Sequence, residues 1–284
     1  MPEMNKPFGF CINTSTIKGQ GLSLVEEIDL AARAGYDAIE PWVREIDEHV
    51  EQGGSLDDLR TRCQDAGLAV ENLIGFFEWA VDEKAARAAG LEEARRAFDL
   101  AAKLGCPKVA APPSGVAGAP GLDLNRAAER YARVIEIGRE YGVVPVLEFW
   151  GAAQSLGCLG EALFVAAQCG QPESCILADV FHMYKGGSPY EGLGLLGPDT
   201  LGLLHMNDFP ADPPRAEIGD ADRVYPGDGV VSLAEILRTL HRVGFRGMLS
   251  LELFNQAYYA RDAAEVLETG LQKMEQAVAG AMGE

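Results

Sequence analysis

A chain of 284 residues is long for an ordinary domain but normal for one α/β barrel, so its length does not require a division into domains. Hydrophobic residues make up 48% and charged residues 24%, which is typical of a globular protein with a large core. The 43 acidic residues outweigh the 24 basic residues and give a formal net charge of −19. This charge disfavours nucleic acid and anionic membranes as partners, because phosphate binding needs clustered Lys and Arg.

The start of the chain and its cysteines favour a cytoplasmic protein. Residues 1–13 contain no long apolar run after a basic start, which argues against a signal peptide. No segment reaches the roughly 20 apolar residues that a membrane-spanning helix needs. The six cysteines lack Cys-x-x-Cys spacing, so we expect buried free thiols in a reducing compartment.

Short apolar segments alternate along the chain with longer segments that carry apolar residues at helical spacing. The predicted strands are Phe8–Asn13, Ala38–Trp42, Ala69–Phe76, Lys108–Pro112, Val143–Trp150, Ser174–Val180, Leu201–Asn207 and Met248–Phe254. The predicted helices are Leu22–Ala34, Leu56–Ala66, Ala85–Leu104, Leu124–Tyr141, Gly160–Gln168, Leu233–Val243 and Ala263–Ala279. After the sixth strand, Gly186–Thr200 is rich in Gly and predicts only a short helical turn. Phe209–Gly229 is long and irregular, and loops of that length in a compact domain are usually functional.

Glycines mark the ends of five predicted helices. Gly35, Gly67, Gly105, Gly142 and Gly244 each lie just past a helical segment and shortly before a strand. This repeated order predicts βα units around a parallel sheet, and eight strands in about 250 residues favour a closed barrel. No change in composition marks a second domain, so we expect an α/β protein with a single (β/α)₈ TIM barrel over residues 1–284.

Four consecutive predicted strands end in an ionisable residue set among apolar ones, namely Glu148, Asp179, His205 and Glu252. Active sites of such barrels lie at the C-terminal ends of the strands, so we expect these four side chains to lie together. One such residue alone is more often a salt bridge or a satisfied core side chain, but the joint pattern favours a site. Buried carboxylates repel one another unless a cation neutralises them, and this ligand set suits Mn²⁺, with Co²⁺, Zn²⁺ or Mg²⁺ as alternatives.

The motifs around these positions resemble those of the xylose isomerase-like sugar isomerase/epimerase superfamily. The motifs are LEFW at Glu148, LADVFH at Asp179, LHMND at His205 and SLELF at Glu252. The similarity extends from the first strand to the last helix, and the superfamily includes ketose 3-epimerases and inosose isomerases. Residues 220–229 look most like the inosose isomerase branch, which implies carbohydrate metabolism and inositol catabolism in particular.

The resemblance implies a metal-dependent sugar or inosose isomerase or epimerase that works through a metal-bound cis-enediolate. Glu148 and Glu252 would both be metal ligands and form the acid/base pair, and Asp179 and His205 would complete the site of one metal ion. The expected substrate is a small neutral polyol or keto-sugar. Relatives often form dimers or tetramers, so the resemblance is compatible with a homo-oligomer.

Four further positions are candidate substrate contacts. His182 and Arg223 would bind substrate oxygens and help to hold the enediolate. Glu40 matches a Glu of the second strand in relatives, and a structural hydrogen-bonding role is an equal alternative. Trp150 is the fourth candidate.

Some aromatic residues and departures from the family bear on the substrate. Trp42, Phe76 and Trp150 are aromatic residues near strand ends that could line the pocket, although core packing is the more usual role for such residues. Ketose 3-epimerases often carry Glu where this chain has Gln154, and inosose isomerase relatives can carry Arg where it has Asn255. Both changes put the substrate in doubt and leave the metal chemistry intact.

Alternative functions follow from the same residues. A metal-dependent lyase or dehydratase acting on a keto-sugar, an inosose or a dehydroshikimate would share the enediolate and then expel a β-hydroxyl. A non-catalytic sugar-binding barrel would be expected to lose a ligand or an acid/base Glu, and none is lost here. Abasic-site endonucleases need a three-metal cluster with several histidines, whereas this chain has four His in total. Two-metal xylose isomerases need further ligands and a catalytic Lys that the sequence does not place.

Overall fold

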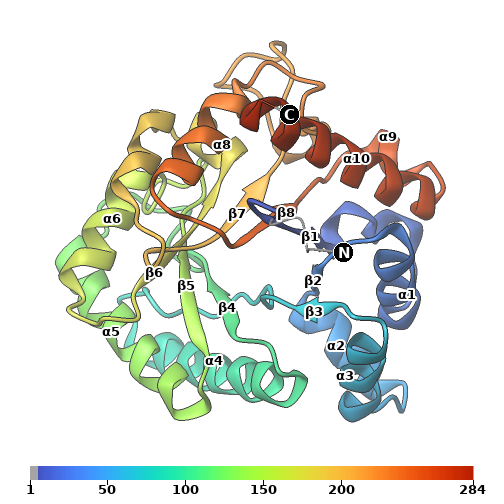
Figure 1. Cartoon of the computed structure of the whole chain (residues 1–284). Helices are drawn as coiled ribbons and strands as arrows, with labels where there is room; N and C mark the ends of the chain where they lie inside the picture. The colour runs from blue at the N-terminus through green and yellow to red at the C-terminus, as the bar shows by residue number, and fades with distance from the viewer. Residues whose placement is uncertain (1–5, 284) are drawn as a thin grey trace.

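A computed structural model, which describes residues 6–283, shows parallel strands in the middle and helices around them (Figure 1). The strands are β1 (Gly9–Asn13), β2 (Ala38–Glu40), β3 (Ala69–Val70), β4 (Lys108–Ala111), β5 (Val144–Glu148), β6 (Cys175–Asp179), β7 (Leu201–Met206) and β8 (Met248–Leu251). The α-helices are α1 (Leu24–Ala34), α2 (Val43–Glu51), α3 (Leu56–Asp65), α4 (Lys84–Leu104), α5 (Leu124–Tyr141), α6 (Leu159–Gln168), α7 (Val180–Lys185), α8 (Leu233–Arg242), α9 (Gln256–Tyr259) and α10 (Ala263–Met282). Four 3₁₀ turns, η1 (Thr14–Thr16), η2 (Lys18–Gln20), η3 (Tyr190–Leu195) and η4 (Asp220–Asp222), lie in the connections.

The sheet has the strand order β3-β2-β1-β8-β7-β6-β5-β4, and the strands pair in parallel. Its two end strands meet at one parallel bridge between Leu73 and Val109. Leu73 donates to the carbonyl oxygen of Lys108 at 3.1 Å and accepts from the amide of Ala110 at 2.9 Å. The predicted TIM barrel is confirmed, and its β3–β4 seam is closed by a bridge in place of a full ladder.

The helix ends follow the signals in the sequence. Ser23 and Glu26 form a reciprocal capping box at the start of α1. The five glycines predicted to end helices all have positive φ, between 68° and 96°. Glycine adopts this left-handed conformation without the steric cost that a Cβ brings, so each can turn the chain out of its helix.

Several segments differ from the predicted elements, among them the unpredicted helix α9 and strands β5 and β8, which end earlier than predicted. β3 ends at Val70, so the prediction that it reaches Phe76 is wrong; beyond Val70 the chain stays in the sheet only through isolated parallel bridges of Leu73 to Val109 and of Ile74 to Trp42. Helix α2 was not predicted, because only Val43 and Ile46 of this charged segment are buried. Helix α7 starts immediately after Asp179 and is too short to show helical periodicity in the sequence.

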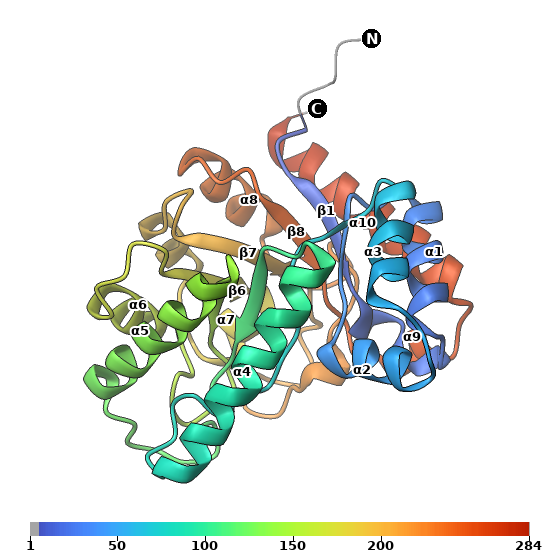
Figure 2. The ribbon, with the colours of Figure 1, turned by 90° about the horizontal axis from the view of Figure 1, so that it is seen from below.

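The barrel places polar residues of neighbouring strands side by side at its C-terminal end. Asp179 of β6 is in register with His205 of β7, and His205 is in register with Ser250 of β8. Glu252 lies two residues beyond Ser250, so its side chain points to the same side of the sheet. Turned by 90°, the ribbon shows α4 and α5 covering one side of the strands and α1, α3 and α10 the other (Figure 2).

Two further expectations concern the described residues. The six cysteines all have free thiols, as predicted. Within residues 6–283, no helix combines the length and the apolar character needed to cross a bilayer.

Candidate active site and metal centre

Asp179, His205 and Glu252 converge at the C-terminal end of the barrel. One carboxylate oxygen of each acid and one imidazole nitrogen all lie within 4.8 Å of one another. All three side chains are buried, with His205 at 0%, Asp179 at 1% and Glu252 at 6% exposure. Their donor atoms can therefore surround a single cation.

Glu40 orients the imidazole of His205 through a contact with one of its two ring nitrogens. The imidazole Nε2 lies 3.3 Å from Oε1 of Glu40, whose carboxylate also accepts hydrogen bonds from Asn72 Nδ2 and Ser250 Oγ. Its Nδ1 lies 3.1 and 3.5 Å from oxygens of the other two members of the trio, yet makes no well-directed hydrogen bond with any described residue. A carboxylate behind a histidine, with the other ring nitrogen turned toward acidic oxygens, is the arrangement of metal-bound histidines. The trio thus fits a divalent metal, and Glu40 lies behind the site and outside the cavity lining.

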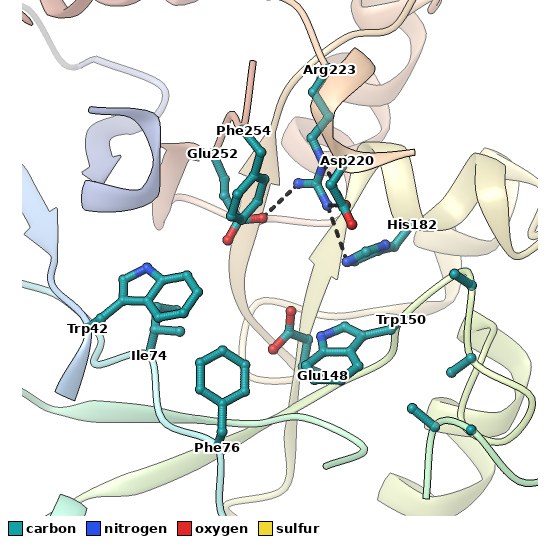
Figure 3. Close-up of a pocket in the computed structure, with 14 residues that line it drawn as sticks. Trp42, Ile74, Phe76, Glu148, Trp150, His182, Asp220, Arg223, Glu252 and Phe254 are labelled. Carbon is teal, nitrogen blue, oxygen red and sulfur yellow. Dashed lines mark hydrogen bonds and ion pairs between the residues drawn. The ribbon is translucent and has the colours of Figure 1, made fainter. Parts of the chain in front are cut away.

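Arg223 supplies positive charge to the same carboxylates. Its Nη1 donates to Oδ2 of Asp179 at 2.9 Å and to Oε2 of Glu252 at 2.7 Å. Its Nη2 donates to Asp220 at 2.5 Å and lies 3.3 Å from Nε2 of His182 (Figure 3). Burial is the largest single influence on Asp179 and raises its pKa. The charges of Arg223 and His182 and the interactions with His205 together outweigh burial and hold the pKa of this carboxyl well below its usual range.

Glu148 lies in the same cavity but outside the trio. It is in register with Leu177, two residues before Asp179. Burial raises the pKa of Glu148 to about 8, although His205 acts in the opposite direction. Figure 3 shows its carboxylate facing the space between Trp150 and Glu252. The structure therefore brings together three of the four predicted ligands and places the fourth across the cavity.

A cavity of about 410 Å³ opens above these groups, a size suited to a small organic ligand. The predicted site residues that line it are Glu148, Trp150, His182, Arg223 and Glu252.

Trp42 and Phe76 also line this cavity, together with Trp150. Of the two roles considered for these three residues, core packing is therefore wrong and pocket lining agrees with the structure; the substrate contact of Trp150 stays a prediction. Phe76 is 47% exposed. Each ring belongs to the last residue of a predicted strand, beyond the end of the observed one, so the alternation of strand side chains did not show which way these rings face.

The long irregular segment between β7 and α8 carries Asp220 and Arg223 to the cavity. The buried carboxylate of Asp208 holds the two ends of this loop by accepting, at 2.8 to 3.1 Å, from the backbone amides of Phe209, Gly227, Gly229 and Val231. A Cβ on Gly229 would lie 2.2 Å from Asp208 Oδ1, so only glycine fits there. The prediction that this loop has a functional role stays a prediction, but its ordered path positions two cavity residues.

Two asparagines that the sequence analysis did not single out hold the acidic residues. Asn13, at the end of β1, donates to Oε1 of Glu252 at 3.1 Å. Asn207, just after β7, donates to Oδ2 of Asp179 at 3.2 Å and accepts from the amide of Phe181 at 2.9 Å. Both stand at C-terminal strand ends, so the criterion that found the ionisable residues would have found them had it included amides.

Known proteins resemble this chain in sequence and in fold. A sequence model described as the xylose isomerase-like TIM barrel matches residues 28–274. The chain belongs to this family. This confirms the predicted superfamily, and similarity to inosose isomerases agrees with the predicted branch.

Individual members of the xylose isomerase-like TIM barrel family are similar over most of the chain. The inosose isomerase of Halalkalibacterium halodurans is 28% identical over 268 residues, covering 91% of this chain and 92% of that protein. The 3-dehydroshikimate dehydratase of Pseudomonas aeruginosa is 29% identical over 262 residues, covering 89% of this chain but 39% of that protein. The crystal structure of IOLI protein with a binding zinc atom has a TM-score of 0.89 at 23% identity, covering 96% of this chain and 99% of that one, which shows the shared fold.

Proposed function

We propose that this protein is a divalent-metal-dependent isomerase or epimerase that enolises a keto-sugar or an inosose. The observation that carries the proposal is the convergence of Asp179, His205 and Glu252 on one point, with Glu148 facing them across a small cavity. Similarity to inosose isomerases over nine-tenths of the chain supports the same reaction class.

Asp179, His205 and Glu252 would hold the metal, and Glu148 would complete the set. Carboxylate oxygens dominate these ligands, which favours Mn²⁺ with Co²⁺, Zn²⁺ or Mg²⁺ as alternatives, and zinc is the metal in the similar IOLI structure. When bound, such an ion supplies Lewis-acid polarisation of a substrate carbonyl.

The proton transfers belong to the two glutamates. Glu148 and Glu252 line opposite parts of the cavity, so one can remove the proton on the carbon beside the carbonyl and the other can return it. Return to the opposite face of that carbon gives an epimer, and return to the neighbouring carbon gives an isomer. Arg223 and His182 lie where they can orient substrate oxygens and stabilise the negative charge of the enediolate.

A lyase or dehydratase is the second candidate. Similarity to 3-dehydroshikimate dehydratase over 262 residues favours it. The same two glutamates would act, but Glu148 or Glu252 would protonate a departing β-hydroxyl in place of carbon.

Proton NMR in D₂O with metal-loaded protein tests the proposal. The panel contains ketoses, inososes and dehydroshikimate, and a chelator-treated sample serves as the control. Deuterium beside the carbonyl supports enolisation, and the product signals separate isomer, epimer and alkene. Absence of exchange with every compound, despite one bound metal per chain, would refute the enzymatic proposal and favour a sugar-binding barrel.

A further inference from the structure

The cavity has a charged side and an apolar side. Figure 3 shows Arg223, Asp220 and His182 gathered on one side, while Trp42, Ile74 and Phe76 lie on the other. The charged groups can satisfy the hydroxyl and carbonyl oxygens of one sugar ring. They leave the apolar side without a polar partner for such a ring.

Three aromatic rings follow one another along the cavity, from Trp42 through Phe76 to Trp150, which lies beside Glu148, and we name them the aromatic strip (Trp42, Phe76 and Trp150). The ring centroids of Trp42 and Phe76 are 5.0 Å apart, and those of Phe76 and Trp150 are 6.0 Å apart.

The indole N–H of Trp42 donates to Asn13 at 3.2 Å, so this residue offers the cavity no free donor. Lys18 Nζ and Arg44 Cζ lie 5.2 and 4.5 Å from its ring centroid, so an aryl group would stack on the other two rings of the strip. Phe76 in the middle is 47% exposed, and exposed aromatic surface beside a cavity marks a place that a ligand covers.

The flank next to the strip carries small residues. Ala117 and Gly118, from the loop after β4, and Ala152 and Ala153, from the loop after β5, line the cavity there.

Gln154, which replaces the Glu of ketose 3-epimerases, is absent from the cavity lining. Its side-chain Nε2 donates to the carbonyl oxygen of Gly118 at 3.1 Å, and its backbone N–H donates to the carbonyl oxygen of Ala117 at 2.7 Å. It therefore ties the two loops together and contributes no side chain to the cavity lining.

We infer that the aromatic strip and this small-residue flank form a second subsite, which binds an aromatic aglycone attached to the ring that is enolised. The inference rests on the proposed function and specifies its substrate class as an aryl keto-glycoside. A bare polyol would occupy the charged side and leave the strip exposed, whereas an aryl group would stack on Phe76 and Trp150 and bury them. The cavity volume of about 410 Å³ accommodates a ligand of two rings.

The test compares methyl and phenyl 3-ketoglucoside with metal-loaded protein, by deuterium exchange in D₂O. We expect the phenyl compound to have a kcat/KM at least tenfold higher, mainly through KM. Phe76→Ala should reduce this preference about tenfold. Phe164→Ala, which removes an exposed ring on α6 outside the cavity lining, should leave the preference unchanged. Ala152→Glu, at an exposed flank position, should also reduce it, and this variant covers the case in which Phe76→Ala does not fold.

Equal kcat/KM for the two glycosides, or a preference that survives both Phe76→Ala and Ala152→Glu, would overturn the inference. Calorimetric binding of phenyl and methyl glucoside, which cannot be enolised, gives a second readout. If no compound exchanges but the phenyl glucoside binds through Phe76, the proposed reaction fails and the subsite stands. If inososes exchange and the phenyl group brings no gain in binding, the reaction stands and the subsite fails.

Discussion

The guanidinium of Arg223 and the carboxylate of Glu252 share a buried hydrogen bond of 2.7 Å, and the same nitrogen donates to Asp179 at 2.9 Å. Two acids proposed as metal ligands are thus neutralised by a side chain of the protein itself. We expect Arg223 to hold these carboxylates together when no metal is bound, and a bound metal to take over much of this role.

Removing this arginine should therefore destabilise the chelator-treated protein more than the metal-loaded protein. In Arg223→Gln, two buried carboxylates lose the positive charge beside them, which lowers the free energy of unfolding by on the order of 3–5 kcal/mol. A bound cation restores much of this free energy, because it supplies positive charge to the same carboxylates. Urea unfolding of both forms measures the difference. Arg261→Gln, which breaks an exposed pair with Glu265, is the matched control. Equal losses in both forms would mean that Arg223 stabilises through its contacts with Phe181 and Phe254.

Glu148→Gln should lower kcat by a factor of about 10² to 10⁴ without unfolding the protein, because the amide cannot transfer a proton. Deuterium exchange and circular dichroism provide the two measurements. Glu129→Gln, on the exposed side of α5, is the control. A near-normal rate in Glu148→Gln would exclude this residue from acid/base chemistry.

Glu40→Gln should weaken metal binding 10- to 100-fold, because Glu40 orients His205 through Nε2. Competition with a chromophoric chelator measures the Kd. Glu71→Gln is the comparison, since its carboxylate pairs with Lys108 instead. An unchanged Kd in Glu40→Gln would show that Asn13, Asn207 and the barrel suffice to position the ligands.

Glu27→Gln should stabilise the protein at neutral and alkaline pH. Burial raises the pKa of Glu27 to about 9, with Glu45 adding to the effect, and its Oε2 has no hydrogen-bond partner among the described residues. The native state therefore retains a proton that the unfolded chain loses above about pH 4.3, and the wild type loses stability as pH rises from there toward 9. The variant lacks this penalty, so we expect its advantage to grow from none near pH 4 to about 1–3 kcal/mol at pH 8.

Urea unfolding across this pH range checks the slope. Glu26→Gln is a control in which the stability difference should change with pH in the opposite direction. Hydrogen bonds from Ser23 lower the pKa of Glu26, so its carboxylate stabilises the folded protein above its unfolded pKa. A difference between Glu27→Gln and wild type that does not change with pH would refute the assignment.

Gly90→Ala should destabilise the protein although alanine favours helices. A Cβ at Gly90 would lie 2.4 Å from the carbonyl oxygen of Glu78, so α4 and the segment before it would have to separate, at a cost of about 1–3 kcal/mol. Gly280→Ala, near the end of α10 with nothing within 4 Å, should be neutral or stabilising by up to about 1 kcal/mol. Thermal unfolding compares the two, and equal effects would contradict the close packing at Gly90.

The barrel and the acidic residues were accessible from the sequence because both depend on local patterns. Helix–glycine–strand order repeats along the chain, and parallel strands collect their C-terminal residues at one end. The direction of side chains in loops follows from tertiary contacts, which is why Phe76 and Trp42 were assigned to the core. The pairing of Arg223 with Asp179 joins residues far apart in sequence, and no spacing rule predicts it. Helix α2 was missed although Val43, Ile46 and Val50 recur at helical spacing, because charged residues fill most of the rest of this short segment.

The single bridge between Leu73 and Val109 makes the β3–β4 seam the part of the barrel wall with the fewest backbone hydrogen bonds between neighbouring strands. The trio stands on β6, β7 and β8, which are flanked by paired strands on both sides. Phe76 and Ala117 follow the two strands that meet at the seam, where two backbone hydrogen bonds hold the wall. In the proposed reaction, the ring that exchanges its proton would bind over strands that are paired on both sides, and its substituent would face the seam. We therefore expect substrates with substituents of different bulk to be accommodated by small shifts at the seam, without movement of the proposed metal ligands.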